Sequence, residues 1–206
     1  IYRLTLFVMD QAIRSAAQLR ERGLPINMSV NLSATLLDHS DLVGTIRVML
    51  TAHHLPAEKL TIEITETAQI ENSRQARQTL AQFRRAGIRL SIDDYGTGQS
   101  NLEYLTEIEA DEIKIDKRFV MTMRDSQRNL EVVKSTIDLA HRLGAVAVAE
   151  GIEDAPTLAL LEQLGCDVGQ GYLLGKPQLF SELINSLSTG RVRQGGVISA
   201  VAVGHR

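Results

Sequence analysis

Acidic, amide or amine side chains recur at the ends of short β-branched segments in this sequence. Six segments each carry one or two of them, in the order Asn31, Glu63 with Glu66, Asp93 with Asp94, Lys114 with Asp116, Glu150 with Glu153, and Gln170. A charged group within a run of Val and Ile is costly to bury unless it is paired or bound to a metal. A single carboxylate of this kind could cap the next helix, but six segments in turn indicate one shared site.

The donor atoms indicate which metal would suit such a site. Carboxylate and amide oxygens, without cysteine or histidine, favour hard cations such as Mg²⁺ or Mn²⁺ over zinc. The five histidines show no metal-binding spacing, and the adjacent His53 and His54 are interpreted as a solvated helix end. Gly96, Thr97 and Gly98 form a glycine loop, but neither the P-loop pattern nor the dinucleotide-binding glycine pattern occurs, so nucleotide binding of those types is not indicated.

Several carboxylates together would repel a phosphate, whereas two bound cations reverse the sign, bridge the phosphate and activate a water. The adjacent Asp93 and Asp94 suit this arrangement, since one carboxylate can bridge two cations while its neighbour binds one. Lys114 can position the attacking water or offset charge, and Glu150 can accept a proton. We therefore predict phosphodiester hydrolysis by a two-metal mechanism.

The elements that must position these groups follow one recurring pattern, an amphipathic helix, a glycine and a short β-branched run. Glycine just past a helix end adopts positive φ without steric cost, and it is expected to do so at 23, 87, 144 and 165. Six strands are predicted, at residues 26–32, 60–65, 88–93, 112–115, 145–150 and 166–169. Strands alternating with helices predict a parallel sheet with helices outside, and parallel barrels place active sites at the carboxyl ends of their strands.

The number of predicted strands is small for a closed barrel. A closed eight-stranded barrel typically needs about 250 residues, and this chain has 206. Either the sheet is open or the sequence begins part-way into a barrel. We favour the second, because the first element, Tyr2–Arg22, is a predicted helix with no strand before it. Residues 190–206 break the pattern and are interpreted as a linker or remnant rather than an added strand, so we expect a domain over residues 1–189 and a tail over 190–206.

Composition excludes several classes of function. A net charge of −3 and an isoelectric point of about 6.0 give no reason to expect contact with bulk nucleic acid or with an acidic membrane surface. Cys166 is the only cysteine, so no internal disulfide can form and a reducing compartment is the default. No apolar run approaches the length of a membrane span. These features predict a cytoplasmic domain, although a parent protein could be membrane-anchored.

Six blocks in this sequence resemble, in order, the signature blocks of the EAL-domain phosphodiesterases. They are NLSA (31–34), EITET (63–67), DDYGTG (93–98), KID (114–116), AEGIE (149–153) and QGY (170–172). The resemblance runs from about residue 4 to residue 180. It implies a TIM-type (β/α) barrel of the EAL kind, incomplete at the N-terminus. It also implies an enzyme that uses Mg²⁺ or Mn²⁺ to hydrolyse the bacterial second messenger cyclic di-GMP to linear pGpG.

The resemblance assigns metal binding to five positions. It implies that Asn31, Glu63, Asp93 and Asp94 are metal ligands, with Asp93 bridging two cations. It implies that Glu150 is the general base or a ligand of the second metal.

Five further positions match supporting residues of the family. Lys114 matches the lysine that contacts the catalytic water, and Asp116 matches its supporting carboxylate. Glu66 and Glu153 match supporting carboxylates, and Gln170 matches a glutamine near the catalytic centre.

The chain departs from the family pattern in two ways. The glutamate of the Glu-Ala-Leu triplet should precede Ile1, on the missing first strand. Because that glutamate is a metal ligand, we expect little or no activity from the chain as given. The loop reads Tyr95 where the family usually has Phe, and Gln99 where it usually has an aromatic residue. Family members use this loop to couple dimerisation to metal binding, so regulation is expected to differ.

Three functions therefore stand beside one another. The first is a cyclic di-GMP phosphodiesterase domain, expected as a homodimer and attached to sensory or GGDEF domains in a longer signalling protein. The second is a receptor that binds cyclic di-GMP without cutting it. The third is a dimerising or partner-docking module.

Overall fold

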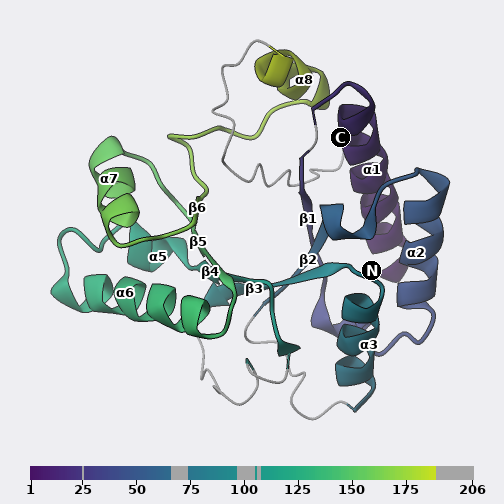
Figure 1. The fold of residues 1–206 in the computed structure, drawn as a ribbon, viewed down its shortest axis with the longest axis horizontal. Coiled ribbons are helices and arrows are strands. Elements are labelled where there is room, and N and C mark those ends of the chain that lie inside the picture. The colour runs from purple at the N-terminus through teal and green to yellow at the C-terminus, as the bar shows by residue number, and fades with distance from the viewer. Residues whose placement is uncertain (25, 66–73, 97–104, 106–107, 189–206) are drawn as a thin grey trace.

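The computed structural model of the chain describes residues 1–24, 26–65, 74–96, 105 and 108–188. Six strands form one sheet in the order β1 to β6, and each pairs in parallel with the next. They are β1 (Met28–Asn31), β2 (Leu60–Thr65), β3 (Arg89–Tyr95), β4 (Glu112–Ile115), β5 (Val146–Ala149) and β6 (Val168–Gly169). The sheet is curled, with helices outside the curl (Figure 1). The predicted fold class, an incomplete (β/α) barrel, is confirmed.

Helices connect the strands and cover the outer face of the sheet (Figure 1). The α-helices are α1 (Tyr2–Glu21), α2 (Leu42–Ala52), α3 (Arg74–Arg85), α5 (Lys117–Val120), α6 (Gln127–Arg142), α7 (Ala155–Gln163) and α8 (Phe180–Ser188). Two short 3₁₀ helices, η1 (Ala34–Leu36) and η2 (Ala57–Lys59), lie in the connections. None of the described helices is long and apolar enough to cross a membrane.

The predicted glycine-terminated helices are confirmed. Gly23, Gly87, Gly144 and Gly165 follow α1, α3, α6 and α7, with φ of 75°, 77°, 73° and 78°. A residue with a Cβ would be strained there, so these glycines let the chain turn sharply from each helix into the next strand.

The two faces of the sheet differ in polarity. In β2 the residues Leu60, Ile62 and Ile64 are fully buried in the hydrophobic core with the helices. Alternate side chains point to the opposite face, and there β2 carries the buried polar residues Thr61 and Glu63. The same alternation gives β1, β3 and β4 buried polar residues on the inner face: Ser29, Ser91, Glu112 and Lys114. The inner face is therefore where chemistry can be done.

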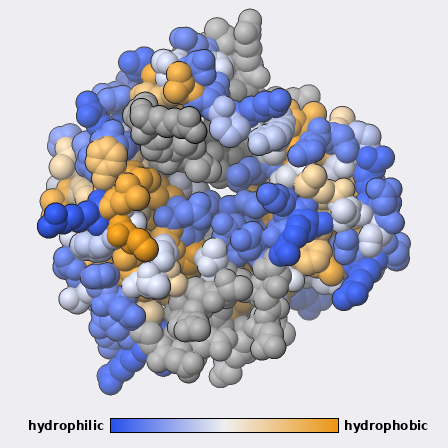
Figure 2. All heavy atoms as spheres, turned by 180° about the vertical axis from the view of Figure 1, so that it is seen from behind, coloured by the Kyte–Doolittle hydropathy of each residue, from blue (hydrophilic) through white to orange (hydrophobic). Residues whose placement is uncertain are grey.

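Some hydrophobic side chains lie on the outer surface instead. Ile1, just before α1, and Leu4 and Phe7 in its first turns recur every three residues and are 85%, 66% and 59% exposed. Figure 2 shows hydrophobic residues gathered toward one side of the face seen there, while hydrophilic residues surround its centre. The exposed stripe on α1 contributes nothing to the inner face.

The first, fifth and sixth strands are shorter than predicted, and the third, which was expected to end at Asp93, continues to Tyr95. The pairing of β3 with β4 shifts register between Ile92 and Tyr95, which marks a β-bulge. The predicted tail, residues 190–206, lies outside the described residues, so the domain boundary at residue 189 stays a prediction.

Candidate active site

Lys114 is the centre of the inner face. Its Nζ lies 2.6 Å from Glu150 Oε1, 3.0 Å from Asp93 Oδ1 and 3.1 Å from Glu63 Oε2. The Lys114 side chain is only 4% exposed, and that of Glu150, the most exposed of the three acids, is 17% exposed. The structure thus brings together acids from β2, from β3 and from the end of β5 around one buried ammonium, toward the carboxyl ends of the strands.

Asp93 and Asp94 are consecutive, yet both contribute oxygens to the same place. In a regular strand neighbouring side chains point to opposite faces. Here the bulge adds a residue, and Asp94 takes a left-handed φ of 58°. As a result Asp93, Asp94 and Glu150 each offer an oxygen within 4.8 Å of the others. The backbone strain at Asp94 therefore serves the site.

Asp116 follows β4 and begins α5. Its Oδ1 accepts hydrogen bonds from the backbone N–H of Arg118 at 2.6 Å and from Arg118 Nε at 3.1 Å. Burial would raise the pKa of the Asp116 carboxyl, but the Arg118 contacts outweigh it and the pKa is lowered. Asp116 is also close enough to Asp94 to raise the pKa of the Asp94 carboxyl. Arg118 was not among the predicted site residues, and only its place two residues after KID could have suggested it.

The pKa values of Lys114 and of the neighbouring carboxyls depend on burial and on one another. Burial disfavours the Lys114 ammonium, but Glu63, Glu150 and Asp93 together raise its pKa, so it stays charged. Burial raises the pKa of the Glu150 carboxyl, and Lys114 opposes that rise. Burial and the neighbouring charge of Asp93 raise the pKa of Asp94. The site therefore holds a charged ammonium beside two carboxyls, those of Glu150 and Asp94, whose pKa is raised.

Other predicted site residues lie at the edges of this group. Asn31 is exposed and pairs in register with Glu63. Gln170 donates its backbone N–H to Ala149 O at 2.8 Å, and its Oε1 is buried without a partner among the described residues. Glu153 is exposed and forms no hydrogen bond or ion pair with a described residue. Tyr95, which is buried, ends β3.

The glycine loop is described only in part. Gly96 follows Tyr95 with a φ of 93°. Glu66, Thr97, Gly98 and Gln99 lie outside the described residues.

The residues present fit a hard divalent cation. Against one ammonium stand the carboxylates of Glu63, Asp93, Asp94 and Glu150. Carboxylates in such excess, with Glu63 buried and the other three partly exposed, call for further positive charge. Glu63 Oε1 is buried and has no hydrogen-bond partner in the part of the chain that the structure describes. An oxygen-only donor set of this kind matches the ligands that Mg²⁺ and Mn²⁺ take.

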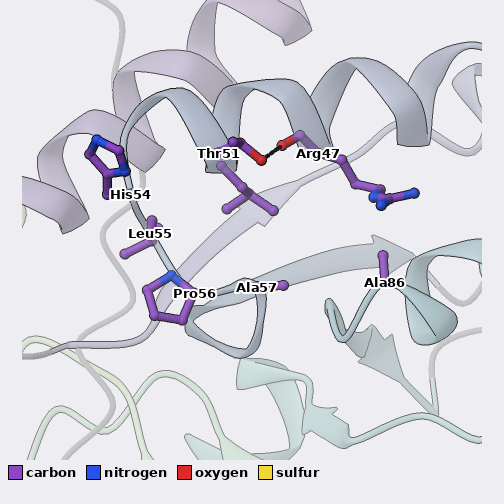
Figure 3. A pocket seen from close by; sticks show the side chains of 8 residues that line it. Arg47, Thr51, His54, Leu55, Pro56, Ala57 and Ala86 are labelled. Carbon is purple, nitrogen blue, oxygen red and sulfur yellow. Dashed lines mark hydrogen bonds between the residues drawn. The ribbon is translucent and has the colours of Figure 1, made fainter.

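A separate pocket of about 500 Å³ lies at the opposite end of the sheet (Figure 3). Its walls come from the end of α2, from η2 and from Ala86, segments that precede β2 and β3. Thr51 Oγ1 donates to Arg47 O at 2.9 Å along one wall, and no acidic residue lines it. It is therefore distinct from the acidic group.

The adjacent histidines also lie away from the acidic group. His53 caps the carboxyl end of α2, as the prediction of a helix end requires. It is not simply solvated, because its Nε2 lies 2.8 Å from Asp10 Oδ1.

Comparisons with known proteins agree with this geometry. Residues 1–177 match the family model of the EAL domain. The chain is 35% identical over 170 residues to "Cyclic di-GMP phosphodiesterase RocR" of Pseudomonas aeruginosa, covering 82% of this chain and 43% of that protein. It is 33% identical over 189 residues to "Bifunctional diguanylate cyclase/cyclic di-GMP phosphodiesterase MucR" of the same organism, covering 91% of this chain and 28% of that protein.

A solved structure is similar throughout the fold. The manganese and cyclic di-GMP complex of BlrP1 from Klebsiella pneumoniae superposes with a TM-score of 0.80 at 34% identity, covering 87% of this chain and 45% of that one. The chain spans less than half the length of these proteins. The match over most of its length shows that this chain belongs to the EAL domain family.

Proposed function

We propose that this domain hydrolyses cyclic di-GMP to linear pGpG in bacterial second-messenger signalling. The observation that carries the proposal is the group of Glu63, Asp93, Asp94 and Glu150 around Lys114, in a chain of the EAL family. RocR and MucR, which bear phosphodiesterase names, support this choice of substrate.

We further propose that two Mg²⁺ or Mn²⁺ ions act in the reaction. Asp93, Asp94, Glu63, Glu150 and Asn31 would hold them. Bound cations of this kind offset phosphate charge and lower the pKa of water. The oxygen-only donor set and the manganese complex of BlrP1 support this part of the proposal.

The chain's own groups then have defined tasks. Lys114 offers a fixed positive charge to a phosphate oxygen or to the attacking water. Burial raises the pKa of the Glu150 carboxyl, and a carboxylate at this place suits the role of a proton acceptor. Asp116, held in place by Arg118, would keep a fixed negative charge beside Asp94.

The remaining assignments rest on the family resemblance. Glu66 and Glu153 would act as supporting carboxylates, and Gln170 would lie near the catalytic centre. The loop at residues 95–99 would couple dimerisation of the chain to metal binding.

The wider context of the domain belongs to the proposal as well. We propose that the domain forms a homodimer. We also place it in the cytoplasm, because Cys166 is the only cysteine and a reducing compartment is the default. Attachment to sensory or GGDEF domains is supported by the bifunctional name of MucR.

The test is made on this chain and on the full-length natural protein. Each is incubated with cyclic di-GMP and Mn²⁺, with and without EDTA, and pGpG is measured by chromatography. The proposal expects metal-dependent pGpG from the natural protein, and a loss of about 100-fold or more in turnover for Glu150→Gln with substrate binding retained. Binding of cyclic di-GMP without any pGpG would establish the receptor function instead. If cyclic di-GMP were neither bound nor cleaved, the docking module would be the remaining function.

A further inference from the structure

Beneath the acidic group, the inner face holds a second ion pair. Arg89 Nη2 lies 3.1 Å from Glu112 Oε1, and their side chains are 25% and 5% exposed. Arg89 is the first residue of β3 and Glu112 the first of β4, so the pair lies at the amino ends of these strands. Glu112 pairs in register with Ser91, which in turn pairs with Glu63. The pair thus occupies the floor of the site and not its ligand group.

Charges alternate from this floor upward. Glu112 and Lys114 are two residues apart on β4 and share a face. The pKa of the Glu112 carboxyl is raised overall, because burial and the charges of Glu63 and Asp111 raise it more than Arg89 and Lys114 lower it. The fields of both Lys114 and Glu63 therefore reach Glu112. The order is Arg89 positive, Glu112 negative, Lys114 positive, and then the acids of the site.

In this series of alternating charges, Arg89 balances the negative charge of Glu112. Without Arg89, Glu112 would be one more buried carboxylate beside a single ammonium. It would draw Lys114 downward and weaken the contacts of Lys114 with Asp93 and Glu150. A buried charge that loses its partner is strongly destabilised, so the surroundings would rearrange toward it.

We propose that Arg89 is a positioning residue, which neutralises Glu112 so that Lys114 stays engaged with the acids of the site and the cation affinity of those acids is set. The inference rests on the proposed function only in that the acidic group binds a divalent cation. It assigns no contact between Arg89 and substrate.

The experiment measures Mn²⁺ affinity by isothermal titration calorimetry on the whole chain. Arg89→Met leaves Glu112 unopposed and frees acidic oxygens from Lys114, so Mn²⁺ should bind about tenfold more tightly. Glu112→Gln leaves Arg89 unopposed, so Mn²⁺ should bind about tenfold more weakly. The double variant should return to within about threefold of the unmodified chain. Arg89→Lys, which keeps the charge, should change the affinity little.

Matched controls come from an exposed ion pair. Arg84 and Glu109 also form a pair, with side chains 39% and 64% exposed. Arg84→Met and Glu109→Gln make the same charge changes in solvent, where screening is strong. Each should alter Mn²⁺ affinity less than about twofold.

The opposite signs of the two single variants separate positioning from structural support. A merely structural pair would weaken Mn²⁺ binding in both variants, and that outcome overturns the inference. Unchanged affinity, or no Mn²⁺ binding by the unmodified chain, overturns it too. If Arg89→Met fails to fold, as judged by circular dichroism, then weakening by Glu112→Gln together with recovery in the double variant supports the inference, and the absence of either refutes it. Cyclic di-GMP cleavage is measured separately, so a chain that shows the opposed shifts without cleavage refutes only the proposed function.

Discussion

Lys114 Nζ and Glu150 Oε1 lie 2.6 Å apart, although one side chain comes from β4 and the other from the residue after β5. This is the shortest of the three contacts between Lys114 and an acid. Parallel pairing aligns Lys114 with Val148, so Glu150 lies two residues further along its chain and reaches back to the ammonium. The contact ties the candidate proton acceptor to the charge that holds the site together.

Replacing Lys114 by Met should destabilise the metal-free chain. Three buried carboxylates would lose their shared counter-charge, and breaking a buried ion pair from one side costs about 3–5 kcal/mol. Urea denaturation in EDTA measures the free energy of unfolding. Lys134→Met is the control, because Lys134 forms an exposed pair with Glu131 at 3.1 Å, worth less than about 1 kcal/mol. Equal losses in both variants would contradict a central role for the Lys114 charge. Mn²⁺ should restore part of the stability of Lys114→Met, since a cation can replace the lost charge.

Gly151, the residue after Glu150, should not tolerate a side chain. It follows Glu150 with a φ of 72°, and an added Cβ would lie 2.5 Å from Lys117 Cβ. Gly151→Ala should therefore suffer both left-handed strain and a steric clash, a loss of about 2–4 kcal/mol in the free energy of unfolding. Gly144→Ala is matched in φ, at 73°, but meets open space, so it should lose only about 1–2 kcal/mol. Equal losses would show that the approach to Lys117 is unimportant.

The sequence was sufficient for the strand count and for the grouping of acids, because burial of alternate residues and the positive φ of glycine are local properties. The alternating Leu60, Ile62 and Ile64 are enough to predict β2, and Gly87 is enough to predict the end of α3. The placement of Asp94 was harder to derive from pattern alone. Strand alternation would send Asp94 away from Asp93, and only the bulge with its register shift brings both to the site.

The floor of the site could not be predicted from the sequence. Arg89 and Glu112 each begin a strand, where a charged residue normally faces solvent. Their pairing depends on the register of β3 against β4, which sets Ser91 opposite Glu112 and leaves Arg89 diagonally across from it. The support of Asp116 by Arg118 likewise requires the turn into α5.

Stability should depend on pH through Asp167. Its Oδ2 accepts a hydrogen bond from the Ala147 N–H at 2.8 Å and lies 2.8 Å from His141 Nε2. Burial would raise the pKa of the Asp167 carboxyl, but these contacts lower it. A lowered pKa stabilises the fold above the unfolded value of about 3.9, and that contribution is lost as pH falls through the folded pKa. The side chain is 40% exposed, so solvent screening limits the whole effect to about 1 kcal/mol.

Asp167→Asn should accordingly be less stable than the unmodified chain at pH 7, and the difference should shrink below about pH 4. Urea denaturation between pH 7 and pH 3 measures it. Asp138→Asn removes an exposed carboxylate on α6 and should show no such difference. If the difference in free energy of unfolding between Asp167→Asn and the unmodified chain stayed constant across this range, the carboxylate charge would not be the source of the stabilisation.

Two buried threonines should respond in opposite ways to the same substitution. Thr61 is fully buried on the inner face, and its Oγ1 has no hydrogen-bond partner among the described residues. Thr79 is equally buried in α3, but its Oγ1 donates to Leu37 O at 2.7 Å. Valine has nearly the shape of threonine and carries a methyl group in place of the hydroxyl. Thr79→Val should lose about 1–3 kcal/mol, because Leu37 O is left buried without its donor. Thr61→Val should be neutral or more stable by about 1 kcal/mol, because a desolvated hydroxyl disappears. Thermal unfolding of both variants measures the contrast, and a loss at Thr61 as large as that at Thr79 would mean that the inner-face hydroxyl is hydrogen-bonded in solution.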